Sequence, residues 1–211
     1  MGPSVAQTGQ DAELLDAWRS GDQAAGERLF DRHADAVARF FENKVCRGAE
    51  DLTQATFLRM IEGRDRVRPE GSFAAFIFGI ARNVLREHLR ELARGRDVDP
   101  AVDSMAELAP GPTTLMGMRQ EHQLMLQGLR GLSIDDQILL ELFYWEDLRT
   151  HEIAQILGVP PPTARRQLSE ARGRLDRKMA QLAKSPDVFD RTARHLDSWI
   201  ADIRRELGGR G

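Results

Sequence analysis

The spacing of apolar residues constrains this fold more than any other feature, because it follows helical intervals and shows no convincing strand-like alternation. The clearest run lies between residues 73 and 92, where steps of three and one put one set of side chains on a single helix face. The set comprises Phe73, Phe76, Ile77, Ile80, Ala81, Val84, Leu85, His88, Leu89 and Leu92. The pattern ends before Gly95 and predicts a helix of about 20 residues in an all-α protein.

Similar patterns predict further helices on both sides of this segment. They cover residues 10–20, 22–45, 50–63, 114–128, 134–145, 150–157 and 161–182. A change of composition separates the two groups, because residues 97–112 hold four acidic residues, three prolines and no Lys or Arg. That segment is interpreted as a linker.

We therefore expect two small helical domains, at residues 10–95 and 114–182, joined by a flexible acidic linker at 96–113. A last amphipathic pattern, from Phe189 to Leu207, predicts a helical C-terminal extension at 183–211. An exposed apolar stripe is unfavourable in water. The extension is therefore expected to cover its own protein, with binding of a partner as the alternative.

The bulk composition is typical of a soluble globular protein. The 211 residues include 30 Lys and Arg against 33 Asp and Glu, a formal net charge of -3. No apolar stretch is long enough for a membrane helix, and the N-terminus lacks the pattern of a signal peptide. We expect a cytoplasmic protein without membrane insertion.

Motifs for catalysis and metal binding are missing from the sequence. The single cysteine, Cys46, rules out an internal disulfide and a multi-cysteine metal site, and we expect it to be inert rather than redox-sensing. The run from His151 begins like a zinc-protease motif, but Gln155 stands where the second histidine would be. There is also no glycine-rich phosphate loop and no nucleophile motif. We therefore expect no enzyme activity, no cofactor and no metal.

Positive charge is concentrated in two segments, one in each predicted domain. Residues 80–96 hold five arginines against two glutamates, and residues 149–178 hold seven basic residues against three acidic ones. Arg82, Arg86, Arg90 and Arg94 step by four and so form a stripe along one helix. A single stripe is equally typical of a solvated face, but one stripe in each domain favours binding to a polyanion.

The second basic segment carries the pattern of a helix-turn-helix. Gly158 can end the first helix in the left-handed conformation, and the prolines at 160–162 suit the turn and the start of a second helix. Long polar side chains on the outer face of that helix suit a major groove, with an ordinary helical hairpin as the alternative. This face holds Thr163, Arg165, Arg166, Ser169 and Arg172, with Gln167 at its boundary.

Three stretches together resemble the extracytoplasmic-function (ECF) group of the bacterial sigma-70 family of RNA polymerase sigma factors. EDLTQATFLRM (50–60) is similar to region 2.2 of that family, and SFAAFIFGIARNVLREHLRE (72–91) is similar to regions 2.3 and 2.4. The stretch 129–175, which contains the helix-turn-helix, is similar to region 4. The order of these motifs and the short linker between them are more specific than any one motif.

The resemblance implies a factor that binds core polymerase and directs promoter recognition and transcription initiation. Family members dock region 2.2 on the clamp helices of polymerase β′, and the matching residues here are Asp51, Gln54 and Leu58. Members melt and read the −10 promoter element with regions 2.3 and 2.4 and the loop before them. The matching positions are Arg64, Arg66, Arg68, Asn83, Arg86, Glu87 and Arg90.

Region 4 of the family reads the −35 element in duplex DNA and contacts the polymerase β flap. The matching residues are Thr163, Arg165, Arg166, Gln167, Ser169 and Arg172. The resemblance also implies that the acidic linker passes through polymerase channels, with a solvated spacer as the alternative. An anti-sigma factor or another regulator is a further expected partner.

Two other functions fit parts of the pattern. A free-standing helix-turn-helix regulator would bind duplex DNA without polymerase, commonly as a dimer on a two-fold site. In that case the helix at 50–60 would serve only as core. An interaction protein that kept the fold without DNA binding would have no need of Arg165, Arg166 and Arg172.

Overall fold

The computed structural model of the protein describes residues 5–45, 47–67, 72–94 and 120–183. Within those ranges the regular elements are eight α-helices and one short 3-10 helix, with no strand. The all-α fold predicted from periodicity is therefore confirmed. Cys46, Arg68, the acidic linker and the extension beyond residue 183 lie outside the described residues.

The chain forms two compact units. Of the described residues, the first unit holds those up to 94 together with 146–164, and the second holds 120–145 and 165–183. The first unit contains α1 (Val5–Arg19), α2 (Gln23–Glu42), α3 (Ala49–Gly63), the 3-10 helix η1 (Arg64–Arg66), α4 (Phe73–Ala93) and α8 (Thr150–Leu157). The second contains α6 (Gln120–Arg130), α7 (Ile134–Tyr144) and most of α9 (Pro161–Leu182).

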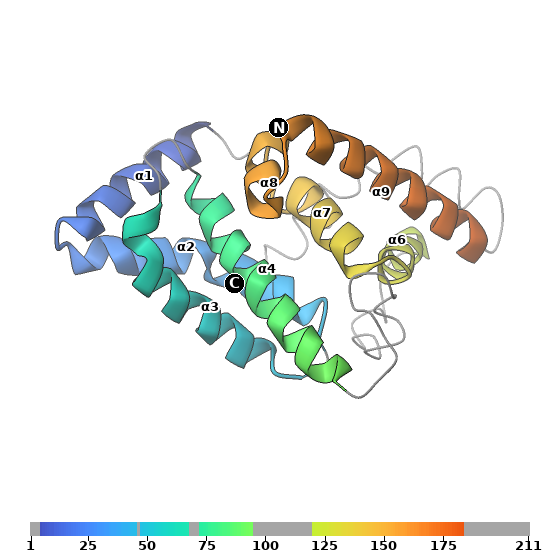
Figure 1. Ribbon diagram of the computed structural model, residues 1–211, viewed down its shortest axis with the longest axis horizontal. Coiled ribbons are helices and arrows are strands. Elements are labelled where there is room, and N and C mark those ends of the chain that lie inside the picture. The colour runs from blue at the N-terminus through green and yellow to red at the C-terminus, as the bar shows by residue number, and fades with distance from the viewer. Residues whose placement is uncertain (1–4, 46, 68–71, 95–119, 184–211) are drawn as a thin grey trace. The chain divides into compact units, whose positions relative to one another are not determined.

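Aromatic side chains from α2 and α4 build the core of the first unit. The ring of Phe40 lies 5.3 Å from that of Phe41 and 5.8 Å from that of Phe78, and all three side chains are buried. In Figure 1, α4 lies along α3, and its buried face also packs against α2. Burial of this face is the main reason why the segment with the clearest apolar period forms a stable helix.

Side chains at the helix starts and in α1 fix the segment before α4. Asp22 and Ser72 cap α2 and α4, because each side chain accepts a hydrogen bond from a backbone N–H three residues later. The Arg19 guanidinium donates to the backbone carbonyls of Arg64 at 2.6 Å and Val67 at 2.7 Å. The end of α1 therefore holds η1 and the residue after it.

Two glycines let α6 and the turn after it approach α9 closely in the second unit. A Cβ atom at Gly128 would lie 2.8 Å from Cγ of Met179, and a Cβ at Gly131 would overlap the aliphatic stem of Lys178. The core between these helices is apolar and buried. Its members include Met125, Ile134, Ile138, Ala171, Leu175 and Met179.

The predicted helix limits agree well with the structure at 150–157 and 161–182, which are the observed bounds of α8 and α9. α1 begins at Val5 rather than at residue 10, because its first residues form helix without an apolar stripe that a periodicity argument can detect. Residues 64–66, at the start of the segment that leads to α4, form η1. Phe30 follows Leu29 in the helical apolar pattern of residues 22–45, but its side chain is exposed.

Candidate nucleic-acid and polymerase interfaces

The outer face of α3 presents polar side chains near its start and apolar ones near its end. Asp51, Gln54, Leu58 and Ile61 follow steps of three and four, so they share this face, and all four are exposed. Leu58 is 62% exposed and Ile61 is 44% exposed, which is unusual for large apolar side chains on a helix that also carries core residues. This exposed strip, residues 51, 54, 58 and 61, is called the α3 strip below.

An exposed aromatic residue was missed by the sequence argument. Phe30 of α2 is 43% exposed, and its ring lies 4.3 Å from that of the buried Phe57 of α3. Periodicity could not separate it from its buried neighbours, because it lies next to Leu29 at the edge of the apolar face. Phe30 adds apolar surface to the part of the unit formed by α2 and α3.

The predicted −10 residues of α4 lie on one side of the helix. Asn83, Arg86, Glu87 and Arg90 are spaced by three, one and three, and all but Arg86 are exposed. Arg86 is half-buried, as is Arg82. The predicted arginine stripe is therefore only partly solvent-facing: a step of four advances about 40° around a helix, so the stripe winds from the core boundary outwards.

The carboxylate of Glu87 is paired with an arginine of α3. The guanidinium of Arg59, on α3, donates a hydrogen bond of 2.6 Å to a carboxylate oxygen of Glu87. The hydrogen bond from Arg59 holds the pKa of Glu87 below its ordinary value of 4.5, and the same bond raises the pKa of Arg59. Arg59 was not among the predicted site residues, because no sequence pattern indicates that two residues 28 positions apart on different helices are paired.

The cations before α4 differ in their surroundings. The Arg64 guanidinium is half-buried and lies 5.1 Å from the ring centroid of Trp18, so it packs back onto α1. Arg66 is exposed and lines one cleft of the first unit together with Asn83 and Phe76. Arg68 lies outside the described residues. Of the two described cations, only Arg66 therefore faces the cleft that Asn83 also lines.

The turn between α8 and α9 has the geometry that the sequence predicts. Gly158 has φ +70°, and the N–H of Val159 donates to the carbonyl of Ala154 at 3.0 Å, which closes the end of α8. The Pro160 carbonyl accepts from the N–H groups of Thr163 and Ala164. The prolines at 161 and 162 therefore occupy the first turn of α9. Backbone N–H groups of a helix's first turn have no partner within the helix, so residues without an N–H cost no hydrogen bond there.

The outer face of α9 carries most of the predicted −35 residues in exposed positions. Arg165, Arg166, Ser169 and Arg172 are exposed, whereas Thr163 and Gln167 are half-buried. Arg166 donates a hydrogen bond of 2.9 Å to Glu170, one turn later. The guanidinium of Arg172 lies 5.9 Å from the ring centroid of Tyr144. The face is therefore basic and made of long donors, as major-groove binding requires.

Two findings on the described residues concern metal ions and membranes. No group of three or more His, Cys, Asp or Glu side chains there could hold a metal ion. No helix in the described part of the chain is long and apolar enough to cross a membrane.

These features define a helical protein with a DNA-binding helix-turn-helix. The family described as Sigma-70 region 2 matches residues 29–95, and the family described as Sigma-70, region 4 matches residues 122–175. The protein belongs to the ECF group of the sigma-70 family of RNA polymerase sigma factors. The function that the motifs predict, a sigma factor for transcription initiation, is therefore confirmed.

Curated relatives agree with this membership. The RNA polymerase sigma factor CarQ of Myxococcus xanthus is 31% identical over 79% of this chain and all of its own length. The ECF RNA polymerase sigma-E factor of Salmonella typhimurium is 27% identical over 82% of this chain and 96% of its own.

Two solved structures share the fold. One is CnrH in complex with the cytosolic domain of CnrY, with a TM-score of 0.58 and 22% identity over 82% of this chain and 99% of that chain. The other is the sigma factor RpoE in complex with the anti-sigma factor NepR from Bartonella quintana, with a TM-score of 0.57 and 22% identity. It covers 73% of this chain and 96% of that chain.

Proposed function

We propose that this sigma factor docks on core polymerase through the α3 strip, reads the −10 element with α4 and reads the −35 element with α9. The proposed domains are residues 10–95 for docking and the −10 element, 96–113 as linker, 114–182 for the −35 element and 183–211 as an extension. The protein acts in the cytoplasm and does no chemistry of its own, since RNA synthesis belongs to the polymerase.

The observation that carries the docking proposal is the exposure of Leu58 and Ile61 beside Asp51 and Gln54. Two large apolar side chains kept in water cost free energy unless a partner covers them. Acidic and amide groups at the other end of the strip can pair with donors on the partner. A partner surface with hydrogen-bond donors and an apolar patch would have the complementary chemistry, and the family resemblance points to the β′ clamp helices.

The −10 proposal rests on the exposed side chains around α4. Asn83 and Glu87 offer amide and carboxylate groups to base edges, and Arg90 and Arg66 supply positive charge for the backbone of a melted strand. Arg86 is half-buried and lies between Asn83 and Arg90 on this side of α4. Arg64 is assigned a positioning role, because its guanidinium is engaged against Trp18.

The −35 proposal rests on the first turns of α9. Arg165 and Ser169 are exposed one turn apart, and Arg172 continues the same face. Arg166 is the candidate for reading a base edge, because its planar guanidinium can pair with guanine once it exchanges Glu170 for DNA. The second unit is also the proposed contact for the polymerase β flap. An anti-sigma factor is the proposed class of restraining partner.

Run-off transcription tests the whole proposal. Purified bacterial core polymerase is supplied with a randomised promoter library, with and without the protein. Transcripts that need the protein and that share spaced −35 and −10 elements are the expected result. Failure to bind core would contradict the docking assignment. Binding to core without any shared promoter element would contradict the two DNA assignments.

A further inference from the structure

The last residue of α1 holds the backbone on both sides of Arg66. One guanidinium nitrogen of Arg19, Nη2, donates to the carbonyl of Arg64 at 2.6 Å and to that of Val67 at 2.7 Å, and Nε also donates to the Arg64 carbonyl at 3.2 Å. Arg64 lies two residues before Arg66, and Val67 follows it directly. A single side chain from α1 therefore connects the two ends of the segment that carries Arg66.

The Arg19 side chain acts as a donor to protein atoms and not as a surface cation. It is only 22% exposed, and its guanidinium lies 3.7 Å from a carboxylate oxygen of Asp16 and 4.0 Å from one of Asp65. Hydrogen bonds from an ionised donor are stronger than those between neutral groups. The contacts of Arg19 therefore hold the segment more firmly than ordinary backbone hydrogen bonds of a loop.

Trp18 supports the same segment from the neighbouring position of α1. Its ring is buried, and its centroid lies 5.1 Å from the guanidinium carbon of Arg64. A Cβ atom at Gly26 would lie 2.6 Å from Nε1 of Trp18, so the ring packs directly on the backbone of α2. Trp18 thus contacts the side chain of Arg64, while Arg19 binds its carbonyl.

The segment around Arg66 has little local structure of its own. The 3-10 helix η1 is three residues long, and the N–H of Val67 reaches the carbonyl of Arg64 only at 3.4 Å, which is long for such a bond. Arg66 itself is exposed and lines a cleft of the first unit together with Asn83. The contacts from α1 therefore set the direction in which Arg66 leaves the backbone.

We propose that Arg19 is a positioning residue for the −10 element. It anchors the backbone around Arg66, so that the Arg66 guanidinium meets the phosphates of the melted strand beside Asn83. A cation that is already held in place loses less conformational freedom on binding than a free one. The anchoring follows from the contacts alone, and only its use at the −10 strand rests on the proposed function.

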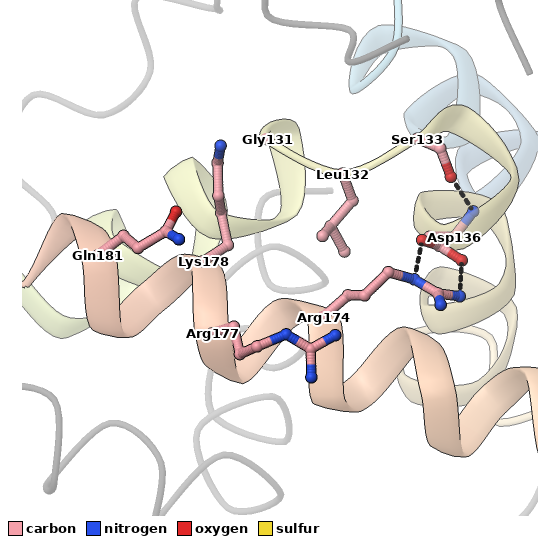
Figure 2. A pocket seen from close by; sticks show the side chains of 8 residues that line it. All are labelled: Gly131, Leu132, Ser133, Asp136, Arg174, Arg177, Lys178 and Gln181. Atoms are coloured by element: carbon pink, nitrogen blue, oxygen red, sulfur yellow. Dashed lines mark hydrogen bonds and ion pairs between the residues drawn. The ribbon is translucent and has the colours of Figure 1, made fainter. Parts of the chain in front are cut away.

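The test variant is Arg19→Gln, and Arg19→Lys, which keeps the charge without the planar fork, serves if Arg19→Gln does not fold. The matched control is Arg174→Gln in the second unit. Arg174 also joins two elements by a pair of hydrogen bonds, because it donates to both carboxylate oxygens of Asp136 at 2.6 Å and 2.8 Å, as the dashed lines in Figure 2 show. Thermal unfolding midpoints check that each variant folds.

Limited digestion of the full chain with trypsin tests the anchoring without DNA. Mass spectrometry follows cleavage after Arg66, and cleavage after the half-buried Arg82 of α4 reports global unfolding. We expect cleavage after Arg66 to be roughly tenfold faster in Arg19→Gln, because opening of the segment no longer breaks these hydrogen bonds. Arg174→Gln should match wild type at Arg66. An unchanged rate in Arg19→Gln, or an equal increase at Arg82, would overturn the anchoring.

The second measurement is binding of polymerase holoenzyme, at saturating core, to a fluorescein-labelled single strand that carries the −10 element recovered by run-off transcription. Arg66→Gln should lower the slope of log K against log salt concentration by about 0.7, as expected for one phosphate contact on a single strand. Arg19→Gln should produce most of the same loss, and the double variant should bind no more weakly than Arg66→Gln. Arg174→Gln should bind as wild type.

The outcomes separate Arg19 from the −10 assignment. Additive losses would mean that Arg19 contacts the strand itself, and equal weakening by Arg174→Gln would mean a general effect of destabilisation, so either result would overturn the proposal. Wild-type binding by Arg19→Gln beside weakened Arg66→Gln would overturn the proposal and leave the −10 assignment in place. Wild-type binding by Arg66→Gln would remove Arg66 from the −10 site, and the role of Arg19 there would fail with it.

Discussion

Arg59 of α3 and Glu87 of α4 are joined by a hydrogen bond of 2.6 Å, and both side chains remain nearly half exposed. The bond connects the helix that carries the α3 strip with a residue proposed to read the −10 element. Exposed ion pairs typically contribute less than about 1 kcal/mol to folding, so stability is a weak reason for this one. Its clearer consequence is that it restricts the direction in which the Glu87 carboxylate points.

Arg59→Gln is therefore expected to change base preference at the −10 element with little effect on folding. The measurement is binding of polymerase holoenzyme to single-stranded oligonucleotides that vary at each −10 position, with the thermal midpoint as the control. Glu87→Gln should change the preference at the same position. The double variant should add little to either, because the two residues act as one unit. Independent, additive effects would contradict the coupling.

Asp51→Lys is expected to abolish association with core polymerase while the protein stays folded. The substitution places a positive charge against donors on the partner, which repels them. The fold loses only the favourable negative charge near the start of α3, which contributes roughly 0.3–1 kcal/mol. Association is measured by native gel shift or size-exclusion chromatography with purified core. Asp35→Lys, which changes an exposed residue of α2, is the control and should associate as wild type. Wild-type binding by Asp51→Lys would remove the α3 strip from the docking surface.

Arg166→Ala is expected to reduce discrimination at one base pair of the −35 element by about 1–3 kcal/mol. Fluorescence titration of holoenzyme with matched and single-mismatch duplexes measures it. Glu170→Ala provides the contrast, because it frees Arg166 from its 2.9 Å partner and should keep the discrimination. A uniform, salt-dependent loss over all sequences would instead mean that Arg166 contacts a phosphate.

Two glycines of the second unit should respond in opposite ways to alanine. At Gly128 a methyl group would lie 2.8 Å from Met179 and 3.1 Å from Leu175, so Gly128→Ala should destabilise the protein by about 1–3 kcal/mol. At Gly173, within α9, the nearest atom is 3.7 Å away. Gly173→Ala should therefore stabilise by roughly 0.5–1 kcal/mol, through helix propensity alone. Denaturant unfolding measures both, and a tolerated Gly128→Ala would show that α6 and α9 pack less closely.

Asp176 supplies a pH-dependent prediction. Burial raises the pKa of this carboxyl above its ordinary value of 3.8, although the charges of Arg172 and Arg177 oppose the shift. The contribution of Asp176 to stability is then fully present below pH 3.8 and is lost as the pH rises through the raised pKa. Asp176→Asn should therefore be more stable than wild type at neutral pH and should lose that advantage in acid. Urea unfolding from about pH 3 to pH 7 measures the difference, and an advantage that grew in acid would contradict the sign.

Much of the local structure was predictable because it depends on neighbours in the chain. The apolar period at 73–92 and the Gly158 and proline signals at 158–162 act within a few residues, and the structure has α4, α8 and α9 there. The family and its function followed from motifs of the same local kind. The assignment of single residues to polymerase or promoter DNA remains a prediction.

The errors arose where a side chain's surroundings come from another helix. Phe30 follows the same helical spacing as its buried neighbours, but the residues it packs against leave it 43% exposed. The arginine steps predicted one solvent-facing stripe, whereas Arg82 and Arg86 are half-buried and Arg64 packs on Trp18. A sequence pattern reports which face a residue is on, but not how far the next helix covers that face.

The sequence by itself determined most of the helices, the turn at 158–162 and the family, since hydrophobic period, turn chemistry and charge order are properties of short segments. Tertiary structure alone decided the pairing of Arg59 with Glu87, the exposure of Leu58 and the pairing of Arg174 with Asp136. Each of these depends on which distant residues meet when the helices pack. Packing is set by the three-dimensional fit of side chains, and that fit leaves no periodic signal along the chain.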